Sequence, residues 1–128
     1  MYFIFVSDDL EPVQLLEQVL HQMDAKKTVI NVPDGFELIQ LLQNVKKGES
    51  YPDLIVLTPA FLRLGGMDLL ELLKTDDIYC LIPVFMLLPE NNGAQETICN
   101  RLGTTYMISP KNQVEWTTAA TRMCAACG

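Results

Sequence analysis

The sequence predicts an α/β domain in which helices cover both faces of a doubly wound, five-stranded parallel sheet. Apolar runs of strand length alternate with segments whose apolar residues recur at helical spacing, which is typical of parallel sheets. One run, Leu54–Leu57, is apolar throughout, as expected for a central strand buried on both faces. The chain has 128 residues, 49% of them hydrophobic, so we expect one core and a single domain over residues 1–128.

Five short apolar runs are the expected strands. Each contains β-branched or aromatic residues, which suit a pleated and buried surface. In chain order they are Tyr2–Val6, Thr28–Val32, Leu54–Leu57, Val84–Leu88 and Thr105–Ile108. Parallel strands joined through helices have their carboxyl ends at one edge of the sheet, so function is expected at that edge.

The segments between the runs have the apolar spacing of amphipathic helices. In the first segment, Val13 and Leu16 belong to a wide apolar stripe. Residues 46–48 (Lys-Lys-Gly) are expected to end the second helix, residues 65–66 (Gly-Gly) to open the third, and Gly103 to end the fourth. The expected helices cover, in order, Val13–Met23, Phe36–Val45, Met67–Leu73, Gln95–Leu102 and Gln113–Ala126.

Charge and hydropathy argue against two classes of partner. The chain has 9 Lys+Arg and 16 Asp+Glu, a net charge of −7, whereas nucleic-acid binding relies on clustered basic residues. The longest apolar stretch, Leu81–Pro89, is far shorter than the roughly 20 residues of a membrane-spanning helix. No basic segment precedes the apolar N-terminal run, and the four cysteines are read as free thiols. We therefore expect a cytoplasmic protein with neither a nucleic-acid nor a membrane partner.

The residues at the carboxyl ends of the expected strands are the candidate site. The first strand is followed by Ser7, Asp8 and Asp9, and the third by Thr58. Leu88 ends the fourth strand, and Ser109-Pro110 follows the fifth. Most of these side chains are neutral, although the chain as a whole is acidic.

Several segments together resemble the receiver domain of two-component response regulators, over essentially the whole chain. The resemblance implies the flavodoxin-like (βα)5 fold of chemotaxis regulators, and 128 residues leave no room for an output domain. The long loop between the second helix and the third strand is similar to that of receivers paired with phytochrome-type histidine kinases. The segments are FIFVSDD (residues 3–9), PDLIVLT (52–58), GGMDLLELLK (65–74), IPVFML (82–87) and YMISP (106–110).

In a working receiver, the resemblance implies, an aspartate after the third strand accepts a phosphoryl group and acids after the first strand hold Mg²⁺. A hydroxyl after the fourth strand and a lysine after the fifth contact the phosphoryl group. Here Thr58 stands at the acceptor position, Leu88 at the hydroxyl position and Ser109 at the lysine position. A threonine cannot form an acyl phosphate, so the resemblance is to a degenerate receiver, a pseudo-receiver, without catalytic residues or cofactor.

The acidic pair of the family can be aligned in two ways. Counting back from the first helix places Ser7 and Asp8 on the two acid positions, which is the alignment we favour, whereas counting from the adjacent acids selects Asp8 and Asp9. Either alignment leaves at most two carboxylates, so Mg²⁺ binding is expected to be weak or absent, with Asp8 and Asp9 as residual candidates.

Three further residues are candidates for a switch or an interface. Tyr106 matches the family's switch aromatic, and Pro110 matches a proline that follows a cis peptide bond. Trp116 is read either as a core residue or as part of a docking face. In the family, the face made here by Gln95–Leu102, Thr105–Ile108 and Gln113–Ala126 commonly supports dimers or effector binding.

The expected function is therefore protein–protein interaction in phosphorelay signalling, without enzymatic activity and without phosphorylation of an aspartate. A histidine kinase or another signalling protein is the expected partner. Two alternatives stay open: phosphorylation through a neighbouring residue, and a small-ligand sensor that uses the degenerate crevice.

Overall fold

A computed structural model describes residues 2–23, 28–45, 49–58, 67–90 and 93–126. The strands are β1 (Tyr2–Val6), β2 (Thr28–Val32), β3 (Leu54–Leu57), β4 (Val84–Leu88) and β5 (Thr105–Ile108). Their bounds confirm the five predicted strands. The helices are α1 (Leu10–Gln22), α2 (Gly35–Gln43), α4 (Met67–Thr75), the 3-10 helix η2 (Tyr79–Leu81), α5 (Gly93–Leu102) and α6 (Gln113–Ala126).

The strands form one parallel sheet with the order β2-β1-β3-β4-β5. In the register of the sheet, Phe5 of β1 lies opposite Asn31 of β2 on one side and Val56 of β3 on the other. This order confirms the predicted doubly wound α/β class, with β1 and β3 central and β5 at an edge.

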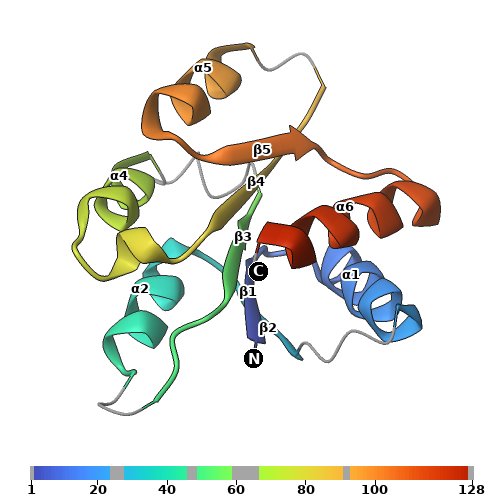
Figure 1. The fold of residues 1–128 in the computed structure, drawn as a ribbon, viewed down its shortest axis with the longest axis horizontal. Helices are drawn as coiled ribbons and strands as arrows, with labels where there is room; N and C mark the ends of the chain where they lie inside the picture. Colours follow the sequence, from blue (N-terminus) through green and yellow to red (C-terminus); the bar gives the residue numbers. More distant parts are fainter. Residues whose placement is uncertain (1, 24–27, 46–48, 59–66, 91–92, 127–128) are drawn as a thin grey trace.

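Helices cover both faces of the sheet, as Figure 1 shows. Alternate strand residues such as Phe3 and Phe5 pack against α1 and α6, whereas Ile4 and Val6 pack against α2, α4 and α5. Because both faces are covered, the central strands are apolar throughout, and all residues of β3 are buried.

The helix ends differ from the predicted ones by a few residues because side-chain caps determine them. The Asp9 carboxylate accepts the Glu11 N–H at 3.0 Å and starts α1 at Leu10, and Asp34 caps α2 in the same way. At the other end, α2 stops at Gln43, so Val45 lies outside the helix.

Two other helix ends bear on the predictions. Gly103 ends α5 with a φ of 68°, a conformation that glycine adopts without strain. The predicted Gly-Gly opening of the third helix lies outside the described residues. Among the helices that the structure describes, none is both long and apolar enough to cross a membrane.

Candidate functional site

A pocket of about 410 Å³ lies at the carboxyl ends of the strands. It brings together seven of the predicted site residues, namely Ser7, Asp8, Asp9, Thr58, Ser109, Pro110 and Trp116. Pro12, Leu87 and Pro89 complete the described lining. The sequence therefore identified most of this pocket, which we call the crevice.

Of the residues predicted for the degenerate phosphoacceptor pocket, Leu88 is the one that does not line the crevice. Its side chain is fully buried in the core on the α2, α4 and α5 side of the sheet, and Leu87 faces the crevice instead. The Leu88 carbonyl nevertheless accepts the Ser109 N–H at 2.7 Å, which joins the ends of β4 and β5. Leu88 thus supports the crevice through its backbone.

The segment after β1 is held by short-range hydrogen bonds. The Ser7 hydroxyl, on a residue only 5% exposed, donates to the Asp9 carbonyl and accepts the Asp9 N–H. The Asp9 carboxylate is the cap of α1, whereas Asp8 is exposed. Of the two acids, Asp9 therefore already has a structural role.

Two neutral side chains join the ends of β1 to its neighbours. The Thr58 hydroxyl donates to the Val6 carbonyl at 3.1 Å across β3 and β1. From β2, the Asn31 amide donates to the carbonyls of Phe5 and Ser7 at 3.0 and 3.1 Å. Asn31 was not among the residues predicted from the sequence; the signal for it was an amide inside the otherwise apolar end of the second strand.

Magnesium prefers several hard oxygen ligands, and Asp8 and Asp9 are the carboxylates among the described residues that line the crevice. The hydroxyls of Ser7 and Thr58 are hydrogen-bonded to the backbone, and the Asp9 carboxylate caps a helix. The part of the chain that the structure describes contains no group of three His, Cys, Asp or Glu side chains that could hold a metal. Of the two carboxylates among the described lining residues, Asp8 is the one that does not cap a helix.

The crevice lining also contains no cation among the described residues. Ser109 is the lining residue directly after β5, and the next residue but one, Lys111, pairs with Glu90 on the surface. The hydrogen bond from Lys111 to Glu90 raises the pKa of that ammonium group. Lys111 therefore forms a surface ion pair with Glu90 and is not among the described residues that line the crevice.

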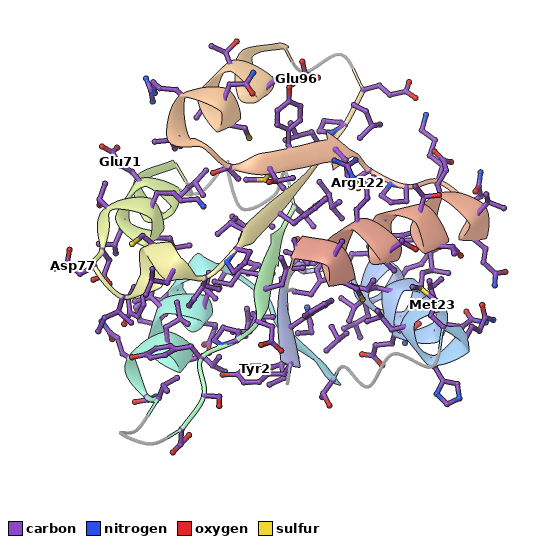
Figure 2. The ribbon with its side chains drawn as sticks, in the orientation of Figure 1. Tyr2, Met23, Glu71, Asp77, Glu96 and Arg122 are labelled. Atoms are coloured by element: carbon purple, nitrogen blue, oxygen red, sulfur yellow. The ribbon has the colours of Figure 1, made fainter. Side chains whose placement is uncertain are left out.

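A second groove of about 410 Å³ runs along β5 between α5 and α6. Tyr106 and Pro110 line it, and Tyr106 also packs against the core cluster that contains Leu88. Figure 2 shows Glu96 and Arg122 on opposite sides of β5, and both line this groove. We call it the β5 groove.

Two predictions about individual residues are resolved by the structure. Trp116 belongs to the core: it is 3% exposed and its ring centroid lies 6.4 Å from that of Phe5. The predicted cis bond before Pro110 is wrong, because the described residues contain no cis peptide bond. The trans form is the ordinary state of X–Pro bonds, and in it Ser109 still donates to the Leu88 carbonyl.

The fold places the chain in a structural class, that of the flavodoxin-like α/β receivers. No family model and no curated protein matches the chain. Solved structures do match, and the similar ones reported below are response regulators.

Three of these structures illustrate the likeness. The Mn²⁺-bound form of response regulator Rcp1 is 20% identical, with a TM-score of 0.79 over 95% of this chain and 90% of its own. The phosphorylated cyanobacterial phytochrome response regulator RcpA is 22% identical, with a TM-score of 0.80 over 95% and 89%. Chemotaxis response regulator CheY4 of Vibrio cholerae is 19% identical, with a TM-score of 0.74 over 95% and 97%. At such identity the likeness establishes the receiver fold.

Proposed function

We propose that this chain is a degenerate receiver that works in signal transduction by protein–protein interaction, without phosphorylation of an aspartate. The observation that carries the proposal is the hydrogen bond from Thr58 to the Val6 carbonyl. A neutral side chain at the end of β3 is already engaged in holding two strands together.

The chemistry of phosphoryl transfer supports the proposal. Transfer needs a nucleophile and cations that stabilise the spreading charge. Thr58 has no carboxylate, its proton is directed at a carbonyl oxygen, and Ser109 supplies no cation. For the same reason we expect weak or absent Mg²⁺ binding and no enzymatic activity.

We place the interaction on the outer surface of the domain, and specifically at the β5 groove. Val114 is 76% exposed and Ile108 is 38% exposed, and both line this groove. Exposed apolar side chains beside acidic and basic ones suit a protein partner. We propose a histidine kinase or another cytoplasmic signalling protein, with a homodimer through α5, β5 and α6 as the second possibility.

The test is exposure of the purified protein to acetyl phosphate or beryllofluoride with Mg²⁺, followed by mass spectra and amide NMR spectra. We expect no added phosphoryl mass and no large shifts around Thr58. Thr58→Val is the matched control, because it keeps the shape of the side chain and removes the hydroxyl. A phosphoryl mass on the native chain that disappears in Thr58→Val would defeat the proposal, and one that persists would indicate a neighbouring acceptor.

A small-ligand sensor is the second candidate function, favoured by the pocket itself. The crevice retains about 410 Å³ beside Pro12, Pro89 and Trp116, within the range of small-molecule sites. Binding of a metabolite with shifts confined to Asp8, Thr58 and Ser109 would favour this function over a protein partner.

A further inference from the structure

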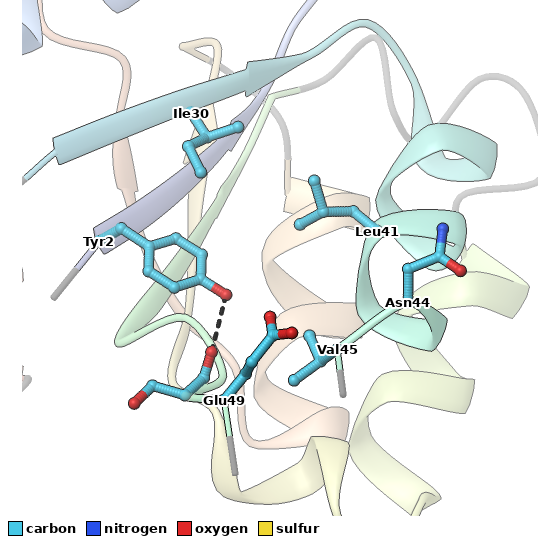
Figure 3. A pocket seen from close by; sticks show the side chains of 7 residues that line it. Tyr2, Ile30, Leu41, Asn44, Val45 and Glu49 are labelled. Carbon is cyan, nitrogen blue, oxygen red and sulfur yellow. Dashed lines mark hydrogen bonds between the residues drawn. The ribbon is translucent and has the colours of Figure 1, made fainter. Parts of the chain in front are cut away.

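The described part of the chain has a larger pocket at the opposite edge of the sheet from the crevice. Its volume is about 560 Å³, and it lies between the start of β1, the middle of β2 and the end of α2. Tyr2, Ile30, Leu41 and Val45 form apolar walls, as Figure 3 shows. The size and the apolar walls are those of a site for a small organic molecule.

The polar groups of this pocket favour a positive charge. Figure 3 shows the Glu49 carboxylate directed into the space between Tyr2 and Val45. The Tyr2 hydroxyl donates its proton to the Ser50 carbonyl at 3.0 Å, so its oxygen lone pairs remain available as acceptors. Both groups therefore accept hydrogen bonds, and a ligand with N–H donors complements them.

Two further features add negative potential from the described residues around the pocket. The last turn of α2 borders it, and this turn contains no basic residue, so the negative end of the helix dipole is left uncompensated within the helix. Burial, and then the charges of Glu49 and Asp53, raise the pKa of the Tyr2 hydroxyl, so both carboxylates act on that hydroxyl. No basic residue is among the described residues that line the pocket.

We propose that this pocket binds a small organic ammonium ion with an apolar body, the ammonium on Glu49 and the body against Tyr2, Ile30 and Leu41. The carboxylate supplies a charge-assisted hydrogen bond, and the Tyr2 ring is one of the apolar walls for the body. This site is independent of the crevice and of the proposed protein interaction, since it lies at the amino ends of the strands.

The experiment is titration of the protein with 2-phenylethylammonium, followed by calorimetry and amide NMR. The neutral 2-phenylethanol and methylammonium serve as probes that keep only the apolar body or only the charge. We expect saturable binding of 2-phenylethylammonium with shifts at Ile30, Leu41 and Glu49, and binding at least about tenfold weaker for either partial probe.

Matched variants separate this site from general attraction to an acidic protein. Because Glu49 is exposed, Glu49→Gln is expected to lower the affinity by up to about fivefold, as for loss of a solvent-exposed ion pair. Glu17→Gln makes the same charge change at an exposed position of α1 and should leave the affinity unchanged. Equal losses in the two variants, equal binding of 2-phenylethanol, or shifts centred on the crevice would each overturn the proposal.

Discussion

Asn31 shows how a single amide can hold the end of a strand. It is half-buried, and its amide donates to the carbonyls of Phe5 and Ser7, with a longer contact to the Val32 carbonyl at 3.5 Å. We expect Asn31→Ala to lower the free energy of unfolding by about 1–3 kcal/mol, because those carbonyls lose their hydrogen-bond donor at a partly buried position. Urea unfolding should show a lower midpoint with an unchanged slope. Asn100→Ala, at an exposed position of α5, should leave the midpoint nearly unchanged; equal effects would contradict this role for Asn31.

Thr58 is the residue at which restoration of the family's chemistry can be tried. We expect Thr58→Asp to give no full switching response, because Ser109 still supplies no cation and Leu88 no hydroxyl. The variant also loses the donor to the Val6 carbonyl, so its unfolding midpoint should fall. Amide NMR with beryllofluoride and Mg²⁺ measures the response. Shifts that extend from the crevice to the β5 groove would count against a degenerate site.

The start of helix α1 gives different roles to two neighbouring acids, Asp8 and Asp9. Asp9→Ala removes the N-cap and should lower the free energy of unfolding by about 1 kcal/mol. Asp8→Ala changes an exposed residue and should alter it by less than about 0.5 kcal/mol. Thermal or urea unfolding of both variants checks the difference. Equal losses would mean that the Asp9 cap contributes no more than a surface charge.

Helix α6 has a buried side and an exposed side, which calls for two different substitutions. Trp116→Ala should destabilise the protein by about 3–5 kcal/mol, because a large buried aromatic is lost from its contact with Phe5. Val114→Ser should leave stability nearly unchanged and weaken partner binding or dimerisation, since Val114 is 76% exposed. Light scattering and co-purification with a candidate kinase test the second variant. Unchanged association would argue against the β5 groove as the interface.

Several buried or partly buried groups make the stability of the molecule depend on alkaline pH. Burial raises the pKa of Tyr2 and Tyr79 above the usual 10.0 and that of Cys99 above 9.0. The unfolded chain therefore loses these protons first, and stability should fall as the pH rises from about 9 to 11. Burial lowers the pKa of Lys74, so this residue opposes the fall just below its usual 10.5.

Urea midpoints measured across this pH range check the alkaline prediction. Tyr2→Phe should flatten the fall, even though it removes the hydrogen bond to Ser50 and lowers stability at every pH. Lys74→Met should steepen the fall, because the opposing contribution is lost. If the urea midpoint depends on pH in the same way in the native chain and in both variants, Tyr2 and Lys74 do not cause the pH dependence.

The strands could be predicted to the residue because they are apolar runs between polar segments, and Thr58 and Ser109 follow directly from the strand ends. The direction of a side chain was harder to predict. A continuously apolar strand does not reveal whether Leu87 or Leu88 faces the crevice, since both faces are covered. The hydrogen bonds of Asn31 could not be predicted either, because the two carbonyls that it contacts are 24 and 26 residues away in sequence.

The neutral contacts that join β1, β2 and β3 at the crevice have a consequence for how a signal could be regulated. The hydrogen bonds of Asn31 and Thr58 need no divalent ion and no phosphoryl donor. Chelators and changes in the supply of phosphoryl donors should therefore leave them in place. Under the proposed function, such a domain is always competent to bind. The strength of its signal would then depend on the number of copies in the cell. Synthesis and degradation of the protein, and not its phosphorylation, would regulate that signal.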